Sequence, residues 1–412
     1  MEYGLIGEKL PHSFSKEIHG YLADYDYQLK ELTPAQLPAF LQERDFKGIN
    51  VTIPYKQAVM PYLDVIDEKA AAIGAVNTIV NRDGKLYGYN TDYDGMVSLI
   101  RHAGLSLEGK SVLILGTGGT SRTAMAVAAD LGASHIYRAS RSAAGQEDLV
   151  SYEDAARMPV QILINTTPSG LYPDLDGQPI DLSRFSWLEG VLDAVYNPLR
   201  TRLVLQAREN RAHAQSGLYM LVSQAAAACE LFLDEKLPQQ TLDRVYRTIH
   251  GQKQNIVLTG MPGSGKSTVG RILAKQMGRE FVDVDTEIIR LAKKPIPDIF
   301  AQMGEARFRE LESQAIAAVA QRTGLVIATG GGAILREENV RRLRQNGRLY
   351  FLDRPLEEIQ PTDDRPLSRD MDALRKRYEE RYFRYTVTAD TRIPVEGSAE
   401  AVVAAIGEEF LI

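Results

Sequence analysis

Short apolar runs alternate with stretches of helical periodicity along the whole chain. Each run is about four to eight residues long and is bounded by glycine, proline or polar residues, which is typical of buried strands. The runs that we predict as strands are residues 48–54, 111–116, 161–166, 191–196, 255–260, 325–332 and 347–353. Strands that alternate with helices in this way predict an α/β fold built on parallel sheets.

Two features of the sequence indicate where the chain divides. Residues 218–233 are nearly all apolar, which predicts a helix buried between other elements. A further helical segment ends near residue 250, and we interpret the short polar segment 251–254 as a linker. A glycine-rich motif after the strand at 111–115 places another boundary near residue 100. The expected domains are 1–100, completed by helices near 218–250, then 101–250, and finally 255–412.

The composition excludes several classes of protein. The net charge of −6 divides into −7 for residues 1–250 and +1 for residues 251–412, so neither part is basic enough for nonspecific nucleic-acid binding. Cys229 is the only cysteine, which excludes an intrachain disulfide and a zinc site built of cysteines. Early charged residues interrupt any signal-peptide core, and no run reaches the roughly 18 apolar residues of a membrane span. We expect a cytoplasmic protein without nucleic-acid or membrane partners; the sequence does not indicate an oligomeric state.

The segment NIVLTGMPGSGKSTVG contains the phosphate-binding pattern G-x-x-x-x-G-K-[ST]. It follows a predicted strand and precedes a helical segment, as a phosphate loop requires. In such a loop backbone N–H groups surround phosphate oxygens, the lysine contacts the β- and γ-phosphates, and the hydroxyl reaches Mg²⁺. The motif therefore predicts ATP and Mg²⁺ as ligands. The residues expected to bind the nucleotide are Gly263, Ser264, Gly265, Lys266, Ser267 and Thr268.

Residues downstream of this loop concern the group that accepts the phosphate. Asp283 and Asp285 are two apart, so on a strand both would point to one face, one toward Mg²⁺ and the other toward the attacking hydroxyl. Arg309 supplies a cation, and the glycines at 330–332 would let the backbone approach a small ligand. The alternative interpretations are structural: a strand-end aspartate often caps a helix, and a glycine run can simply turn the chain.

Together these motifs resemble shikimate kinase. The resemblance covers about residues 254–412 and rests on GMPGSGKS, FVDVD, IPDIFAQMGEARFRELE, ATGGGA and DRPL in this order. It implies a P-loop kinase domain with a parallel sheet flanked by helices, with Ser267 and Asp283 at Mg²⁺ and Asp285 at the hydroxyl being phosphorylated. It also implies catalytic roles for Lys266 and Asp285.

The same resemblance assigns arginines to the two ends of the reaction. Arg365 would close on the transferring phosphate, a role that the charge on the γ-oxygens requires. The ring acid would be held by Arg309, Gly331 and a late arginine, which the family's R-x-x-x-Y pattern identifies as Arg381. Arg377 and Arg384 remain alternatives to Arg381, and residues 356–364 lack the arginine usual in the family.

A second glycine-rich motif, GTGGTS, lies between a predicted strand and a helix in the first part of the chain. The residues expected at a dinucleotide are Gly116, Gly118, Gly119, Thr120 and Ser121. About twenty residues further on, an NAD site would place an acidic residue against the ribose hydroxyls. This chain has Ser140, Arg141 and Ser142 there, and an arginine can pair with a 2′-phosphate, so the sequence predicts NADP(H).

Polar residues gather in short motifs of the otherwise apolar first 100 residues. Ser13 and Ser15 could share one small anion. Lys56 and Asp92 suit hydroxyl/carbonyl redox chemistry, because a positioned group must move the proton of the oxygen as hydride is transferred. The other members of the set are Asn50, Thr52, Asn77, Asn90 and Thr91. Each alone is more often a turn or cap residue, but the whole set predicts a small-molecule site.

This set resembles shikimate dehydrogenase over roughly residues 1–250. The matching motifs are HSFSKEIH, GINVTIPYK, IGAVNTI, YNTDYDG, LGTGGTSR, NTTPSGL, DAVYNP and SGLYMLVSQA. The resemblance implies an α/β substrate domain joined to a Rossmann-like NADP domain, and it makes Lys56 and Asp92 the catalytic pair. The implied substrate contacts, besides Asp92, are Ser13, Ser15, Thr52, Asn77, Tyr196 and Gln224. The implied nicotinamide contacts come from the backbone near Thr166, Val195 and Gly217.

The two resemblances concern the same metabolite. We therefore interpret the chain as a bifunctional enzyme that reduces 3-dehydroshikimate to shikimate with NADPH and then phosphorylates shikimate with MgATP. One alternative is an NAD-dependent quinate/shikimate dehydrogenase fused to a kinase acting on another small acid. Another is that the kinase domain is not catalytic and regulates or stabilises the dehydrogenase.

Overall fold

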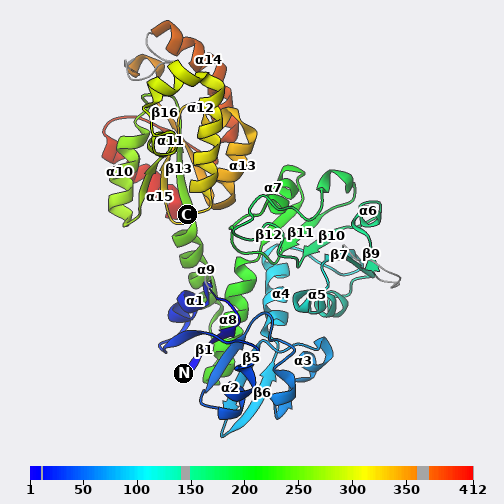
Figure 1. The fold of residues 1–412 in the computed structure, drawn as a ribbon. Coiled ribbons are helices and arrows are strands. Elements are labelled where there is room, and N and C mark those ends of the chain that lie inside the picture. Colours follow the sequence, from blue (N-terminus) through cyan, green and yellow to red (C-terminus); the bar gives the residue numbers. More distant parts are fainter. Residues whose placement is uncertain (11–12, 141–148, 360–370, 412) are drawn as a thin grey trace. The chain divides into compact units, whose positions relative to one another are not determined.

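The computed structural model describes residues 1–10, 13–140, 149–359 and 371–411. It divides into two compact units, Met1–Ile249 and His250–Ile412, whose elements are labelled in Figure 1. The division falls inside helix α9 (Gln239–Lys253), so the segment expected to be a polar linker continues this helix as far as Lys253. Among the described residues, no helix is long and apolar enough to cross a membrane.

The first sheet of unit 1 is mixed. In the described residues its strand order is β2-β1-β3-β5-β6-β4. Strand β1 pairs in parallel with β2 and β3, whereas β5 runs antiparallel to both β3 and β6. The strand bounds are β1 (Tyr3–Gly7), β2 (Tyr27–Glu31), β3 (Gly48–Val51), β4 (Val65–Ile66), β5 (Thr78–Arg82) and β6 (Lys85–Tyr89).

The antiparallel pairing follows from the tight turn between β5 and β6. Asp83 and Gly84 form this turn, and both have positive φ, 52° and 83°. Two central residues with positive φ are the mark of a type I′ hairpin, for which Asp-Gly is a strong sequence signal. Periodicity alone did not predict β5 and β6, although this dipeptide could have identified them.

The second sheet of unit 1 is parallel throughout its described residues. Its strand order is β12-β11-β10-β7-β8-β9. The strand bounds are β7 (Ser111–Leu115), β8 (His135–Ala139), β9 (Leu149–Val150), β10 (Ile162–Asn165), β11 (Gly190–Asp193) and β12 (His213–Ser216). Because these strands are parallel, their carboxyl ends and the loops that follow them share one edge of the sheet.

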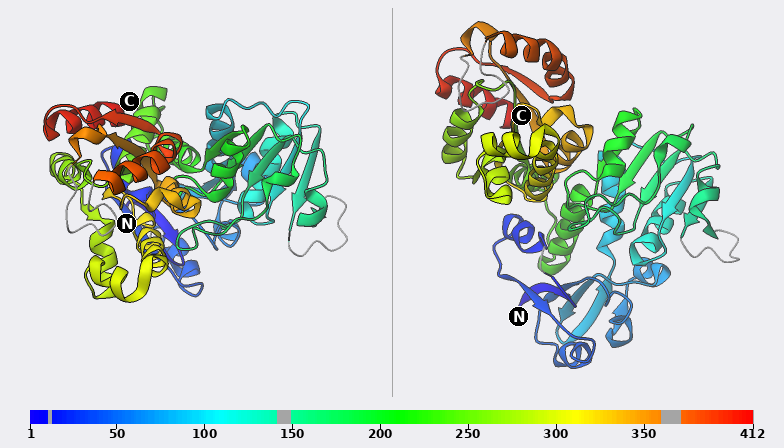
Figure 2. Two further views of the ribbon diagram at one scale, coloured as in Figure 1. Left: turned by 90° about the horizontal axis from the view of Figure 1, so that it is seen from above. Right: turned by 45° about the horizontal axis from the view of Figure 1, so that its top comes forward.

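Helices α4 (Thr91–His102) and α8 (Leu218–Leu233) join the two sheets of unit 1, as the views in Figure 2 show. One end of α8 packs with Met96 and Leu99 of α4 in the core beneath the second sheet. Its other end places Phe232 against Tyr3 and Leu5 of the first sheet. The apolar helix predicted from the sequence is therefore buried, and it fixes the first sheet relative to the second.

The remaining helices of unit 1 are short. They are α1 (Ser15–Leu22), α2 (Leu37–Glu43), α3 (Glu68–Ile73), α5 (Gly119–Asp130), α6 (Tyr152–Ala155) and α7 (Arg202–Glu209), with the 3₁₀ turns η1 (Met60–Tyr62) and η2 (Leu182–Arg184). Helix α5 begins directly after the strand and the glycine-rich loop that the sequence predicts. Gly118 precedes its first residue, and Gly119 is that residue.

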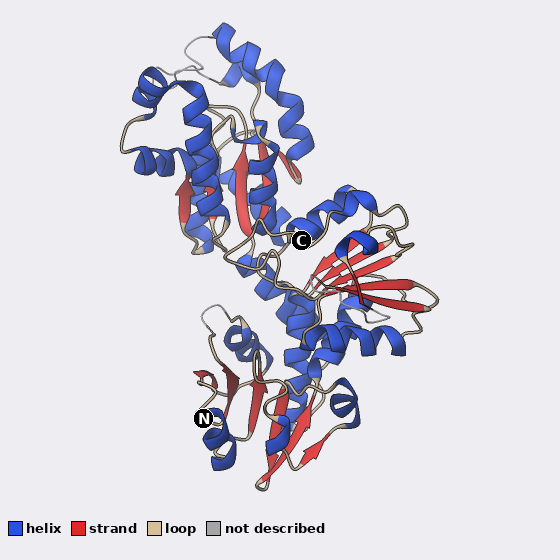
Figure 3. Cartoon of the chain, turned by 45° about the vertical axis from the view of Figure 1, so that its right-hand side comes forward, coloured by secondary structure: helices blue, strands red, loops and turns tan. Residues whose placement is uncertain are grey.

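Unit 2 is built on a parallel sheet with helices on both faces, as Figure 3 shows. In the described residues its strand order is β14-β15-β13-β16-β17. The strand bounds are β13 (Asn255–Thr259), β14 (Phe281–Asp283), β15 (Val326–Ala328), β16 (Gly347–Asp353) and β17 (Thr391–Pro394). The predicted α/β class, with helices flanking a parallel sheet, is thus confirmed for this unit.

The helices of unit 2 form two layers. Helices α10 (Lys266–Met277) and α15 (Ala399–Leu411) lie on one face of the sheet. The other face is covered by α11 (Val284–Ala292), α12 (Ile296–Ala320), α13 (Glu337–Asn346) and α14 (Met371–Thr388), with the 3₁₀ turns η3 (Ala333–Leu335) and η4 (Leu356–Glu358) nearby. Helix α12 is kinked at Gly304, where φ is 77°.

The carboxyl end of α9 is bound by unit 2. Arg279 donates one hydrogen bond to the carbonyl of Gln254 and another to that of Gly251, both at 2.6 Å. The N–H of Gly324 donates to the carbonyl of Lys253 at 3.1 Å. The last carbonyls of a helix lack partners within the helix, so these donors satisfy groups that would otherwise depend on water.

A buried histidine lies in the core of unit 1. The ring of His19 stacks on Tyr27 with 3.8 Å between centroids, and its Nδ1 lies 2.6 Å from the hydroxyl of Tyr25. Burial lowers the pKa of His19 to about 3. The ring is therefore neutral in the folded state at any pH at which the protein is ordinarily handled.

We predict that His19 makes unit 1 sensitive to acid. Its unfolded pKa is near 6.5 and its folded pKa is lower, so unfolding takes up a proton below pH 6.5 and stability falls as the pH falls. The free energy of unfolding of the wild type, minus that of His19→Phe, should shrink by about 1.4 kcal/mol per pH unit between pH 6 and 4. Urea unfolding followed by the fluorescence of Trp187, the only tryptophan, measures it. Parallel pH profiles for the two proteins would contradict the prediction.

Candidate active sites

Unit 1 holds a cavity of about 470 Å³ between its two sheets. The loops after β3, β10 and β11 and the helices α4, α5 and α8 supply its walls. The sequence-predicted residues that line it are Ser13, Ser15, Asn50, Thr52, Lys56, Asn77, Asp92, Thr120, Thr166, Val195, Tyr196, Gly217 and Gln224. Residues from distant parts of the sequence thus meet at one place, whereas Asn90 and Thr91 of the polar set lie outside the lining.

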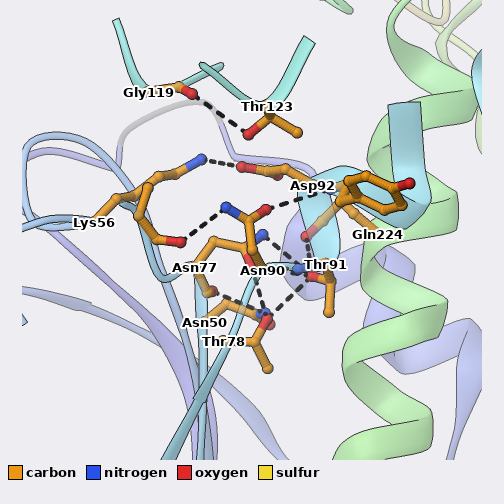
Figure 4. Close-up of polar contacts among 12 residues, drawn as sticks. Asn50, Lys56, Asn77, Thr78, Asn90, Thr91, Asp92, Gly119, Thr123 and Gln224 are labelled. Carbon is orange, nitrogen blue, oxygen red and sulfur yellow. Dashed lines mark hydrogen bonds and ion pairs between the residues drawn. The ribbon is translucent and has the colours of Figure 1, made fainter. Parts of the chain in front are cut away.

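Lys56 and Asp92 form an ion pair in this cavity. Nζ of Lys56 donates to Oδ2 of Asp92 at 2.5 Å, and the two side chains are 17% and 11% exposed. Figure 4 shows them pointing toward each other. Asp92 lies in the first turn of α4, where the partial positive charge of the helix end favours a carboxylate. The pair can therefore hold a charged ammonium at a cavity wall with its proton available.

The Asn77 amide is held by buried hydrogen bonds, also drawn in Figure 4. Its Oδ1 accepts from the N–H of Thr91 at 2.7 Å, and its Nδ2 donates to the hydroxyl of Thr91 at 3.1 Å. Asn50 donates to the hydroxyl of Thr78 at 3.0 Å and accepts from the hydroxyl of Tyr27 at 2.7 Å. Because Oδ1 is engaged with the backbone and one N–H of the amide with Thr91, the second N–H of Asn77 is the group that it can offer to a ligand.

The glycine-rich loop of unit 1 connects β7 to α5. Gly116 has a φ of 106°, and a Cβ atom there would lie 2.9 Å from the hydroxyl oxygen of Thr166, so only glycine fits. Ser121, which stands where the fingerprint expects glycine or alanine, is buried and donates to the carbonyl of Gly116 at 2.7 Å. The serine therefore closes the loop internally, and its hydroxyl is directed at the protein.

The other predicted dinucleotide residues follow the ends of β7 and β8. Gly118 and Gly119 form the amino end of α5, outside the lining of the cavity. Ser140 follows directly after β8, which neighbours β7 in the sheet. Arg141 and Ser142 lie outside the described residues.

Asp193 is a buried residue that the sequence analysis did not select. It ends β11, beside Asn165 at the end of β10. Its carboxylate accepts hydrogen bonds from Asn165 Nδ2 at 2.9 Å, from the N–H of Val195 at 3.0 Å and from the hydroxyl of Thr201 at 2.6 Å. The carboxylate thus ties together the two loops that carry Thr166 and Val195. Burial raises its pKa to about 6.

Unit 2 holds a cavity of about 390 Å³ above the carboxyl ends of its strands. The sequence-predicted residues that line it are Gly263, Gly265, Lys266, Ser267, Thr268, Asp283, Asp285, Arg309, Gly331, Arg377 and Arg381. Ser264 is buried behind this wall, and Arg384 is exposed on α14 away from it. Arg365 lies outside the described residues.

The phosphate loop runs from β13 into α10. Gly265 has a φ of 94° immediately before the helix, a conformation that favours glycine. Nζ of Lys266 donates to the carbonyls of Gly260 and Met261 at 2.9 and 2.8 Å, so the lysine lies across the loop. The hydroxyl of Ser267 donates to Oδ2 of Asp283 at 2.7 Å. A hydroxyl and a carboxylate oxygen this close form a donor set suited to Mg²⁺.

The prediction that Asp283 and Asp285 lie together on a strand is wrong. Strand β14 ends at Asp283, which caps α11 by accepting a hydrogen bond from the N–H of Asp285. Asp285 is therefore in the first turn of the helix. Both carboxylates still line the cavity, because capping turns the chain at the sheet edge and keeps the two residues beside the phosphate loop.

Arg309 and Arg381 lie on different helices and line the same wall of the cavity. Arg309 pairs with Glu312 at 2.8 Å and with Glu305 at 3.1 Å. Arg381 is buried and donates to the carbonyl of Gly331 at 3.0 Å. The sequence-based prediction did not include Glu312. Its position three residues after Arg309 on a helix could have predicted this ion pair. Burial raises the pKa of Glu312, and the charge of Arg309 opposes that shift.

Charge is unevenly distributed around this second cavity. The basic side chains in its lining are Lys266, Arg309, Arg354, Arg377 and Arg381, and the acidic ones are Asp283, Asp285 and Glu312. The excess of positive charge among the described lining residues suits ligands that carry phosphate and carboxylate groups.

Comparison with known proteins identifies the first unit. Residues 5–79 match the family model of the shikimate dehydrogenase substrate-binding domain. The chain is 38% identical over 256 residues to shikimate dehydrogenase (NADP(+)) of Clostridium beijerinckii, covering 58% of this chain and 95% of that protein. The chain belongs to the shikimate dehydrogenase family.

Solved shikimate dehydrogenase structures have the same fold. Shikimate dehydrogenase 1 of Peptoclostridium difficile has a TM-score of 0.56 at 34% identity, covering 60% of this chain and 98% of that one. The Thermus thermophilus enzyme, solved with NADP(H) and shikimate, has a TM-score of 0.55 at 28% identity, covering 60% of this chain and 99% of that one. Residues 262–410 match the shikimate kinase family model. Both resemblances found in the motifs are therefore confirmed, and the chain joins two enzyme domains.

We predict that Asp193 stabilises the dehydrogenase unit more at lower pH. Its folded pKa of about 6 lies above the unfolded value of 3.8, so the folded state binds the proton first as the pH falls. The free energy of unfolding of the wild type, minus that of Asp193→Asn, should rise by about 2 kcal/mol in total from pH 6 to pH 4, because the unfolded carboxyl also begins to bind its proton near pH 4. Trp187 fluorescence in urea measures this difference. A value that is constant or falls over this range would show that Asp193 is ionised in the fold.

Proposed function

We propose that this chain catalyses two consecutive reactions. The dehydrogenase unit would reduce 3-dehydroshikimate to shikimate with NADPH, and the kinase unit would transfer the γ-phosphate of ATP to the hydroxyl created by that reduction. The observation that carries the proposal is that the chain's two families act on one compound, each with a cavity containing the chemistry required. The product of the first reaction is the substrate of the second.

The residues of unit 1 fit a dinucleotide. At Gly118 and Gly119 a Cβ atom would meet open space, so the bare backbone at the amino end of α5 forms a cradle of the kind that binds a pyrophosphate. Gly116, Gly118, Gly119, Thr120, Ser121 and Ser140 would hold it, with Arg141 and Ser142 at the 2′-phosphate. Thr166, Val195 and Gly217 would meet the nicotinamide. When bound, NADPH supplies the hydride.

Lys56 has the role of proton donor in this proposal. Its ammonium would hydrogen-bond to the substrate ketone, stabilise the negative charge that develops on the oxygen and deliver the proton. Asp92 keeps the ammonium aimed into the cavity through the 2.5 Å contact and would accept from a substrate hydroxyl. Ser13, Ser15, Thr52, Asn77, Tyr196 and Gln224 would bind the rest of the substrate.

The residues of unit 2 fit MgATP. Gly263, Ser264, Gly265, Lys266 and Thr268 would hold the phosphates, and Ser267 and Asp283 would hold Mg²⁺ with the two oxygens that already meet. When bound, Mg²⁺ and ATP supply the activated phosphoryl group. Asp285 would accept the hydrogen bond of the attacking hydroxyl and orient it. Arg309, Gly331 and Arg381 would hold the shikimate ring acid, with Arg365 at the transferring phosphate.

The test is a coupled assay with one variant for each unit. Wild-type protein given 3-dehydroshikimate, NADPH and MgATP should consume NADPH and yield shikimate 3-phosphate by mass spectrometry. Lys56→Ala should lower the turnover of NADPH by about 10²–10⁴, the usual contribution of a positioned proton donor, and still phosphorylate added shikimate. Asp285→Asn should accumulate shikimate. The exposed residues Lys85 and Asp298 give matched controls, Lys85→Ala and Asp298→Asn.

Three results would contradict the proposal in different ways. Faster reduction with NADH than with NADPH would favour the NAD-dependent alternative. Shikimate that accumulates in the wild type would mean that the kinase unit accepts another acid or does not catalyse. Full turnover by Lys56→Ala would remove that residue from the chemistry.

We also predict which late arginine holds shikimate. Arg381 is buried beside Gly331, Arg377 lies in the same cavity, and Arg384 is exposed. Arg381→Gln should raise the KM for shikimate about 10–100-fold with little change in the KM for ATP, because one charge-assisted hydrogen bond to a carboxylate is lost. Arg384→Gln should leave both constants unchanged. A larger effect on the shikimate KM from Arg377→Gln than from Arg381→Gln would reverse the assignment.

A further inference from the structure

Arg354 lies at the edge of the unit 2 sheet where the phosphate loop begins. It follows β16 directly, and β16 pairs in parallel with β13, with Phe351 opposite Thr259. Leu352 packs with Val269 of α10, on the face of the sheet to which the phosphate loop leads. Arg354 is two residues further on, and it lines the same cavity as the loop.

The guanidinium of Arg354 makes few contacts with the protein. Its Nε is buried and has no hydrogen-bond partner among the described residues. The nearest carboxylate in the described chain is that of Glu358, whose Oε2 lies 3.8 Å from Nε, beyond hydrogen-bonding distance. The side chain is 30% exposed. A charged group at this depth gains most when a ligand supplies the missing acceptor.

Three neighbouring arginines differ from Arg354 because their guanidinium groups donate to acceptors of the protein. Arg309 pairs with two glutamates, Arg381 donates to the carbonyl of Gly331, and Arg392 on the next strand donates to Asp353 at 2.6 Å. Compared with these three arginines, Arg354 leaves the most N–H groups available to a ligand. A planar guanidinium matches phosphate oxygens bidentately, and the cavity already carries a positive excess.

We propose that Arg354 binds phosphate oxygens of the nucleotide at the phosphate loop. This inference rests on the proposed kinase function only in requiring a nucleotide there. Arg354 would add a second cation, supplied by the end of β16, to the one that Lys266 supplies from the loop itself. Its contribution is to nucleotide affinity and does not depend on which acid accepts the phosphoryl group.

The test is a calorimetric titration of the full chain with two probes, MgATP and inorganic tripolyphosphate with Mg²⁺. Arg354→Gln should weaken binding of both about tenfold, the loss expected for a charge-assisted hydrogen bond. Arg354→Lys should recover part of the affinity. Arg375→Gln, which removes an exposed arginine of α14, is the matched control and should change neither. Unaltered dehydrogenase turnover and an unaltered melting temperature will show that the variants fold.

Each other outcome overturns the inference in a recognisable way. Weaker MgATP binding with unchanged tripolyphosphate binding would place Arg354 at the base or ribose. Unchanged binding of both probes would leave it without a nucleotide role while the kinase proposal stands. A wild type that binds neither probe would overturn both proposals together.

Discussion

Both cavities depend on the parallel pairing of strands. Parallel strands end at a common edge, so the residues that follow them meet there even when they are far apart in the sequence. In unit 2 this edge brings the phosphate loop after β13, Asp283 at the end of β14 and Arg354 after β16 to one cavity. In unit 1 the ends of β10 and β11 are in register, which puts Asn165 beside Asp193 and unites two loops.

The two cavities manage charge differently. In unit 1 the described residues pair a lysine with an aspartate, so the ammonium is held in place and largely balanced. In unit 2 basic side chains outnumber acidic ones around the cavity. These arrangements match the proposed chemistry, because a ketone reduction needs one directed proton whereas phosphoryl transfer needs charge to balance several anionic oxygens.

Local motifs could be predicted from the sequence, and tertiary neighbours could not. The phosphate loop, the glycine-rich loop and the Lys56–Asp92 pair were identified because each depends on residue types that chemistry restricts strongly. Asp285 was assigned to a strand because spacing alone cannot tell that Asp283 ends it by capping a helix. Glu312 and Asp193 were missed because their importance comes from burial and from partners on other elements. The hairpin between β5 and β6 differs from these, because its Asp83-Gly84 turn is a signal that the sequence itself carries.

Helix α9 changes where the chain can be divided. A polar segment before a strand suggests a cut at residues 251–254, but the carbonyls of Gly251, Lys253 and Gln254 are acceptors for groups of the kinase unit. A kinase fragment that starts at Asn255 would leave the guanidinium of Arg279 and the N–H of Gly324 without these acceptors. A kinase fragment that keeps these acceptors therefore begins within the helix, so the two units share this structural element.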